Sequence, residues 1–297
     1  MQIFTSDSFS LYEVGGAPGG EAYLLVSPEG TLLIDSGFAF SALALIANIE
    51  QVVGTRNLDY LFLTHSHYDH ASGSVWCKQR WPHVQIIATA YTQSVFARPG
   101  AIRAIKQLNS QVATERGIDF DDGDKLELLN VDRVVHTGDR LVLGDLAFEV
   151  YEAPGHTRCS AMLWCADEHM LCACETLGVY LTDDLVMPAF MVDYESSLAA
   201  IDLAIRLAPQ RILLNHRQVI EGEKAKRFLT HARRDAVRAA QLIRQGSQNG
   251  QSQQQLTGKL KRLFYTDEAR VIQPEIAFDL NIRSMVALLA DAPVFID

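Results

Sequence analysis

The apolar positions near the start of the chain form short runs and then switch to helical spacing. Residues 22–27 and 31–35 are two short β-prone runs, and Pro28-Glu29-Gly30 between them is typical of a hairpin turn. Ser41 is predicted to cap a helix that ends near Val53, because apolar residues recur there every three to four positions.

The alternation of strand-like and helix-like segments continues along the chain. The predicted segments are a strand over 58–64, a strand over 84–88, a mostly helical stretch over 91–116, β-rich sequence over 125–174, a helix over 195–207 and a strand over 211–214. Strands mixed with helices in this order predict an α/β protein in which two sheets are covered by helices.

The C-terminal part of the chain differs in character. Residues 223–245 are predicted to form one long helix rich in Ala and Arg, and 246–255 are polar and low in complexity, which is typical of a loop or linker. Two apolar segments follow, over 256–265 and 282–290. We therefore predict a main domain over 1–222 and a helical C-terminal cap over 223–297.

Composition and charge argue against nucleic acid and membranes as binding partners. The chain has 297 residues with 36 acidic and 26 basic side chains, a formal net charge of −10, and its bases form no long run, so nucleic acid is not expected as a partner. The first ten residues do not resemble a signal peptide, and no apolar run approaches the roughly 20 residues that cross a bilayer. We expect a cytoplasmic protein with no membrane partner.

The number and spacing of the cysteines also agree with a cytoplasmic protein. Their number, five, is odd, and they show no disulfide pattern, which agrees with reducing conditions. Cys172 and Cys174 lie two apart in an apolar context, and Cys159 is near His156. We interpret these cysteines as small packing residues and not as metal ligands.

Candidate chemistry is concentrated directly after the strand predicted over 58–64. The next residues are His65-Ser66-His67-Tyr68-Asp69-His70. In extended backbone His65 and His67 point to the same side and can bind one ion, while Asp69 and His70 can reach a neighbouring ion. Imidazoles mixed with a carboxylate suit zinc, iron or manganese. The alternative is a surface loop that happens to be rich in His, which is less favoured because three of the nine histidines gather in six positions.

This pattern resembles the signature of metallo-β-lactamase-fold hydrolases. Ala153-Pro154-Gly155-His156-Thr157 resembles the second ligand motif of that family. The resemblance implies a four-layer αββα sandwich with two divalent metal ions per chain, Fe or Zn, with Mn as a third candidate, and it implies that His156 joins His65 and His67 on the first ion.

Three further residues match family positions. Glu175 stands where the family usually has an Asp that bridges the metals, and His216 stands in Asn-His-Arg where Gly-His-Gly is common. The resemblance implies that both are ligands, although the longer Glu side chain is a departure. Asp35 resembles a position that steadies the metal loop, and a plain turn-forming Asp is the alternative.

The resemblance also implies a mechanism. Two neighbouring ions can hold a hydroxide nucleophile and polarise a carbonyl, so no Ser or Cys nucleophile is required. Asp69 is the candidate that orients the nucleophile, and Tyr68 or Tyr194 is the candidate that contacts the oxyanion. The alternative for either Tyr is a packing role.

Within the fold, several segments resemble the quinolone-signal response proteins, a group of 2-aminobenzoylacetyl-CoA thioesterases of alkylquinolone signal synthesis. The matching segments are residues 64–70, 102–111, 177–178 and 283–289. The resemblance implies a cap over a buried pocket and hydrolysis of an acyl-CoA thioester. The alternatives are an acyl-homoserine lactonase and a glyoxalase II-like hydrolase, since all of them polarise a carbonyl.

A hypothesis of another class is a regulatory protein that docks on a transcription regulator. Arg233, Arg234 and Arg238 on the helix predicted after residue 223 are the candidate docking face, and a solvated helix surface is the alternative. A homodimer is the other partner hypothesis.

Overall fold

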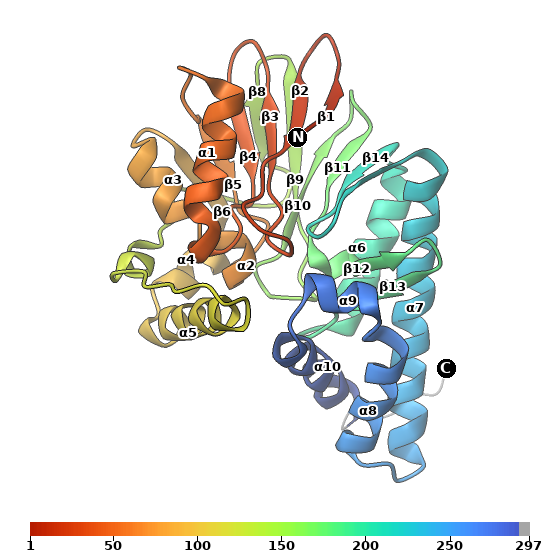
Figure 1. Ribbon diagram of the computed structural model, residues 1–297. Helices are drawn as coiled ribbons and strands as arrows, with labels where there is room; N and C mark the ends of the chain where they lie inside the picture. Colours follow the sequence, from red (N-terminus) through yellow and green to blue (C-terminus); the bar gives the residue numbers. More distant parts are fainter. Residues whose placement is uncertain (291–297) are drawn as a thin grey trace.

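Two β-sheets face each other in the computed structural model, and helices cover the outer face of each, so the fold has four layers (Figure 1). The structure describes residues 1–290. The first sheet follows chain order and consists of β1 (Gln2–Thr5), β2 (Ser10–Glu13), β3 (Tyr23–Val26), β4 (Thr31–Ile34), β5 (Tyr60–Phe62), β6 (Gln85–Thr89) and β7 (Arg133–Val135). Its strands β4 to β7 run parallel, and β1 to β4 are antiparallel.

The second sheet has the order β15-β14-β11-β10-β9-β8, and β11 and β14 are its parallel pair. Its strands are β8 (Arg140–Leu143), β9 (Leu146–Glu152), β10 (Ala161–Cys165), β11 (Met170–Cys172), β14 (Arg211–Leu213) and β15 (Val219–Glu221). A separate hairpin pairs β12 (Val179–Thr182) with β13 (Leu185–Met187).

The helices fall into two sets. Those of the first half of the chain are α1 (Ala42–Val53), α2 (Tyr68–Ala71), α3 (Ser74–Arg80), α4 (Ala90–Phe96) and α5 (Pro99–Glu115). Those of the second half are α6 (Tyr194–Leu207), α7 (Gly222–Gln248), α8 (Gln253–Phe264), α9 (Asp267–Ile272) and α10 (Glu275–Ala290). Within residues 1–290 there are also three short 3-10 helices, η1 (Ala39–Ser41), η2 (Lys125–Leu128) and η3 (Glu175–Leu177).

Side-chain alternation along the strands separates the hydrophobic layers. In β4, Leu33 packs toward α1 and its neighbouring helices, whereas Leu32 and Ile34 pack between the two sheets together with Phe62 and Phe148. Successive residues of a strand point to opposite faces, so a strand covered on both sides is apolar throughout. The predicted α/β class with two helix-covered sheets is confirmed.

Two local predictions were wrong. Ser41 does not cap α1 with its side chain, because it belongs to the 3-10 turn η1 and its hydroxyl donates to the carbonyl of Phe38 over 3.3 Å. The linker predicted over 246–255 is mostly helical, since α7 extends to Gln248 and α8 begins at Gln253. Gly246 is buried against Leu256, which allows the two helices to pack closely at their junction.

The C-terminal helices are attached to the rest of the chain through a shared core. Phe228 and Ile243 of α7 and Phe278 of α10 belong to the same cluster as Leu171 and Ile212 of the second sheet. The division into domains 1–222 and 223–297 stays a prediction, and residues 291–297 of the predicted cap lie outside the described residues. Within residues 1–290, no helix is long and apolar enough to cross a membrane.

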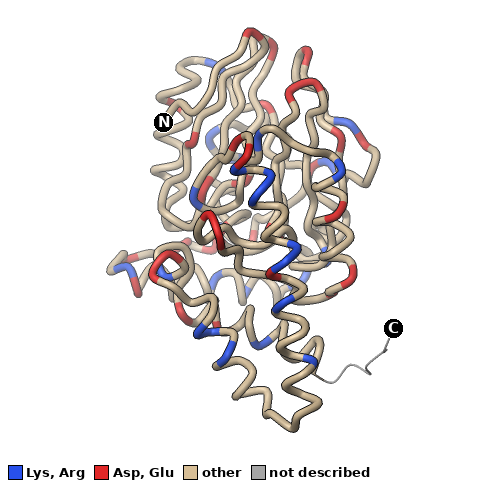
Figure 2. Tube along the Cα trace, turned by 90° about the vertical axis from the view of Figure 1, so that its right-hand side faces the viewer, with Lys and Arg blue, Asp and Glu red and all other residues tan. Residues whose placement is uncertain are grey.

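The basic residues of α7 are spaced along the helix (Figure 2), and its acids are Glu223 and Asp235. Arg233 donates to Asp202 over 2.6 Å, and Arg234 donates to Asp235 over 2.8 Å, so two members of the predicted docking face are held by acids of the chain itself. Docking through this face stays a prediction.

Candidate metal centre

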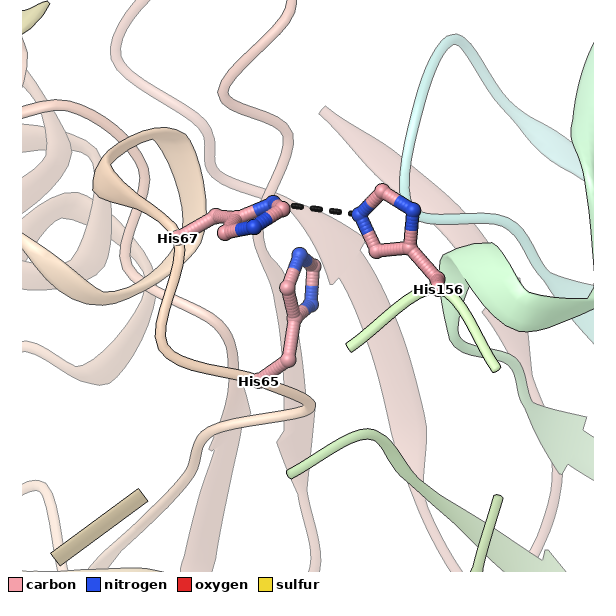
Figure 3. A group of neighbouring side chains, drawn as sticks. All are labelled: His65, His67 and His156. Carbon is pink, nitrogen blue, oxygen red and sulfur yellow. Dashed lines mark hydrogen bonds between the residues drawn. The ribbon is translucent and has the colours of Figure 1, made fainter. Parts of the chain in front are cut away.

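Three imidazoles converge where the chain leaves the first sheet. β5 ends at Phe62, and the extended segment after it carries His65 and His67 before α2 begins. His156 enters from the loop between β9 and β10, and the three rings face one another (Figure 3). The His67 Nδ1 and His156 Nε2 atoms are 3.0 Å apart, and the ring centres of His65 and His67 lie 4.6 Å apart. Their nitrogens can therefore hold one metal ion.

A second group lies beside the first. It consists of Asp69, His70, Glu175 and His216, whose ligand atoms all lie within 4.8 Å of one another. Asp69 and His70 are on the short helix α2, Glu175 begins η3 after β11, and His216 follows β14. Because β11 and β14 are parallel neighbours, their ends deliver Glu175 and His216 to the same edge of the sheet.

Glu175 connects the two groups. Its Oε2 atom lies 2.9 Å from Nε2 of His156, which belongs to the first group. Its Oε1 atom lies 3.1 Å from Nε2 of His70 and contacts Nε2 of His216, which belong to the second. One carboxylate thus presents one oxygen to each group.

A further shell of hydrogen bonds orients the imidazoles. Nδ1 of His156 lies 3.2 Å from the carbonyl oxygen of Ala189, and because a carbonyl only accepts, Nδ1 donates this hydrogen bond and Nε2 faces Glu175. Nδ1 of His70 likewise lies 3.0 Å from Oδ2 of Asp35. Such partners determine which nitrogen is available to a metal.

The loop before His156 depends on a glycine. Gly155 has φ of +150°, and a Cβ added there would lie 2.1 Å from Oγ of Ser197 on α6. Close packing of the loop on α6 therefore requires the absence of a side chain at this position.

Burial and proximity shift the protonation equilibria of both groups. Burial lowers the pKa of His65 well below its ordinary value and that of His67 to about 3. Burial also acts to lower the pKa of His216, but the Glu175 carboxylate outweighs it and raises that pKa to about 10. Burial raises the pKa of Glu175, whereas His156 and His216 lower it by more, so the carboxyl stays ionised.

The donor set fits metal ions. Within residues 1–290, six buried side-chain atoms lack a hydrogen-bond partner, and four of them belong to this site: His65 Nε2, Asp69 Oδ1, His216 Nδ1 and Glu21 Oε2. Nδ1 of His216 and Oε2 of Glu21 lie 3.5 Å from each other, whereas His65 Nε2 and Asp69 Oδ1 have no such partner. Because buried polar atoms are normally paired, these two atoms indicate that an ion or the water it binds completes the site. Histidine nitrogens mixed with carboxylate oxygens suit divalent transition metals. The two groups are compatible with a dinuclear metal site.

A cavity of about 200 Å³ opens over the second group. Its lining residues from the metal site are His67, Asp69 and Glu175, with Tyr68 beside them. The opposite walls are formed by Leu108 of α5, Met191, Gln273, and Ala277, Leu280, Asn281 and Ser284 of α10. The C-terminal helices therefore form one wall of the cavity.

The two predicted tyrosines are placed differently. Tyr68 lines the cavity, and burial raises the pKa of its hydroxyl, which keeps it protonated. Tyr194 is not among the lining residues, because its ring packs against Phe190 with centres 5.0 Å apart and lies under the guanidinium of Arg244. The structure brings Tyr68 to the site and leaves Tyr194 in the core beside it.

Sequence reasoning missed two residues around the site, Glu21 and Gln273, and interpreted a third, Cys159, as a packing residue. Glu21, whose carboxylate lies 3.5 Å from Nδ1 of His216, comes from a loop with no motif. Gln273 lies in a segment for which no helix was predicted. Cys159 contacts the hydroxyl of Ser66 at 3.3 Å and that of Thr157 at 3.2 Å, and so connects the two histidine loops. Its position three residues after His156 was the one available signal.

The fold is shared with solved structures at low sequence identity. A metallo-beta-lactamase family protein from Thermus thermophilus is 14% identical, with 93% of this chain and 91% of that chain covered and a TM-score of 0.63. The FEZ-1 metallo-beta-lactamase from Legionella gormanii is 19% identical, with 78% and 92% covered and a TM-score of 0.54. The chemotaxis sensor ODP, solved as a peroxy diiron species, is 15% identical, with 78% and 94% covered and a TM-score of 0.55.

A match to a sequence-family model is more specific evidence of family than structural similarity at low sequence identity. The model of the metallo-beta-lactamase superfamily matches residues 15–216, which is more than half of the chain and contains every residue of the two metal-binding groups. The chain therefore belongs to the metallo-beta-lactamase superfamily.

Proposed function

We propose that this protein is a dinuclear-metal hydrolase that cleaves an acyl-CoA thioester. The observation that carries the proposal is the carboxylate of Glu175, which presents one oxygen to each of two ligand groups and lines the cavity beside them. Superfamily membership supports metal-dependent hydrolysis. The predicted ligands are His65, His67 and His156 for one ion and Asp69, His70 and His216 for the other, with Glu175 between them.

The residues of the chain divide the work of hydrolysis. When bound, the two ions acidify a water molecule and polarise a carbonyl oxygen. Asp69 would orient that water and accept its proton through Oδ1, which has no hydrogen-bond partner, and burial raises the pKa of this carboxyl, which favours acceptance. Tyr68 keeps its hydroxyl proton and lines the same cavity, so it can donate to the oxyanion that develops on attack. These roles are part of the proposal.

The cavity supports a compact acyl group as the buried part of the substrate. Its volume of about 200 Å³ is below the roughly 300–1,000 Å³ of sites that enclose a drug-sized ligand. A coenzyme A moiety must therefore remain outside while the acyl carbonyl reaches the metals. Leu108 and Met191 give the cavity apolar walls. Together with the resemblance to the quinolone-signal group, this favours an aromatic acyl group such as 2-aminobenzoylacetyl.

Iron and zinc are the proposed metals, with manganese as the third candidate. The donor set is nitrogen and oxygen, and no cysteine belongs to either group among the described residues. Imidazole and carboxylate ligands bind all three metals. The chemotaxis sensor of similar fold was solved as a diiron species, which supports iron.

The test is release of free thiol from defined thioesters. Protein purified without chelators is assayed on 2-aminobenzoylacetyl-CoA and on aliphatic acyl-CoAs, with the His67→Ala variant as control. We expect thiol release by the holo-protein well above that of the variant. Equal thiol release by the holo-protein and the variant would contradict the proposal. Activity on lactones or glutathione thioesters in place of acyl-CoAs would indicate another hydrolase of the fold.

A further inference from the structure

An unpaired acceptor faces the cavity from the C-terminal helices. Gln273 follows the end of α9 and lines the cavity, and its Oε1 atom is buried without a hydrogen-bond partner. Of the six such atoms within residues 1–290, four belong to the metal site and another is the hydroxyl of Tyr23 on β3. Gln273 is thus the member of this set that faces the cavity from the side opposite the metals.

The fold does not account for the Gln273 side chain. The residue ends α9 through its backbone, whose N–H donates to the carbonyl of Ala269 over 2.9 Å, and the carboxamide takes no part in that bond. Buried polar atoms are normally paired, and an exception requires an explanation. A ligand that enters the cavity would supply one.

A second carboxamide lies on the same wall. Asn281 of α10 is more than nine-tenths buried and lines the cavity. Ser284 also lines it, but its hydroxyl already donates to the carbonyl of Leu280 over 2.9 Å. The wall contributed by α9, α10 and the segment between them therefore combines apolar side chains with the unpaired acceptor of Gln273 and the carboxamide of Asn281.

We propose that Gln273 and Asn281 select acyl groups that carry a hydrogen-bond donor, an amine or a hydroxyl, over acyl groups of the same shape that lack one. The assignment of the bound group as an acyl group rests on the proposed function. A ligand that fills the cavity displaces water from the carboxamides, and one that cannot replace those hydrogen bonds leaves the buried acceptor of Gln273 unpaired. Sites built to hydrogen-bond a substrate O–H or N–H discriminate strongly against analogues without it.

The selectivity is testable by binding, without any reaction. The probes are 2-, 3- and 4-aminobenzoate and the corresponding hydroxybenzoates, each compared with the methylbenzoate of the same substitution pattern, because a methyl group has nearly the same size and cannot donate. Dissociation constants are measured by titration calorimetry on metal-loaded protein. We expect at least one donor-bearing acid to bind about tenfold more tightly than its methyl counterpart.

Three variants separate recognition from a structural role. Gln273→Met keeps the length and removes the acceptor, so the ratio of the two dissociation constants should fall close to one. Gln273→Glu keeps an acceptor, and the preference should remain. Gln241→Met, at an exposed position of α7, should leave the ratio unchanged.

Two outcomes would overturn the inference. One is equal binding of donor-bearing and methyl acids by the wild-type protein, including no binding of either. The other is a preference that survives in Gln273→Met. Because the probes contain no thioester, loss of the thiol-release activity together with retained selectivity would remove the proposed function and leave this inference standing.

Discussion

Asp35 accepts a hydrogen bond from Nδ1 of His70 over 3.0 Å, and it does so from a left-handed backbone conformation with φ of +57°. The same carboxylate accepts from the backbone N–H of Thr64 over 2.8 Å and from the carboxamide of Asn215 over 3.0 Å. These bonds tie the end of β4 to the histidine loop and to the segment after β14. A strained backbone conformation is kept when several surrounding contacts hold it in place. At Asp35 these contacts are hydrogen bonds, and one of them orients the predicted metal ligand His70.

Replacing Asp35 should weaken metal binding at the second group. Asp35→Ala leaves Nδ1 of His70 without its acceptor, and loss of such an outer partner typically lowers metal affinity about 10- to 100-fold. Competition with a chelator of known affinity measures the change. Asp59→Asn, which disturbs comparable hydrogen bonds to Thr31 away from the metals, is the control and should retain wild-type affinity. Unchanged affinity in Asp35→Ala would show that the contact does not position His70.

The pattern of apolar residues predicted those strands and helices whose signal lies within a short stretch of the sequence. The strand before His65 and the helix ending at Val53 were identified because their apolar spacing is complete within a dozen residues. The helix α9 and the hairpin β12–β13 were missed, since both are short and are defined by packing against distant elements. The linker prediction over 246–255 failed for the same reason, because burial of Gly246 against Leu256 is not visible in a polar stretch.

The residues of the site also differ in whether a local sequence pattern predicted them. The residues predicted as ligands all belong to the two groups that the fold brings together, because each stood in a motif or directly after a strand. Glu21 and Gln273 are separated from those motifs in sequence and reach the site only through the three-dimensional packing of the loop before β3 and of α9. No pattern within a single chain identifies such residues.

Shortening the carboxylate between the groups should change the number of bound ions. In Glu175→Asp the side chain loses one methylene, so one carboxylate can no longer contact both His156 and His216 as it does now. We expect about one tightly bound ion per chain in place of two, measured by elemental analysis after desalting. Glu175→Gln keeps the length and removes the charge, and it serves as the comparison. A variant Glu175→Asp that still retains two ions would show that the length of the Glu175 side chain is not required to hold both.

Removal of the metals should destabilise the folded protein. The ions bind a site formed only in the folded state, so at a free concentration 100-fold above the dissociation constant they add about 2.7 kcal/mol to the free energy of unfolding. For a chain of this size we expect chelation to lower Tm by at least about 5 °C. Thermal melts with and without added metal measure this shift, and it should be smaller in His67→Ala, which lacks one predicted ligand. A Tm independent of metal would contradict the site.

Asp235 should stabilise the packing of the β12–β13 hairpin on α7. Its side chain is fully buried, and Oδ2 accepts the backbone N–H of Val186 over 3.0 Å while Arg234 donates to Oδ1 over 2.8 Å. Asp235→Ala leaves that N–H buried without an acceptor, which costs about 1–3 kcal/mol in the free energy of unfolding. Urea denaturation followed by circular dichroism measures the loss.

Two comparisons make this last prediction specific. Asp235→Asn retains an oxygen for Val186 and should lose less stability than Asp235→Ala, since only the charge paired with Arg234 is removed. Asp202→Ala removes an exposed ion pair with Arg233 and should change stability little, because exposed pairs are screened by solvent. If Asp202→Ala proved as destabilising as Asp235→Ala, the effect would come from the charge of α7 and not from the buried hydrogen bond to the hairpin.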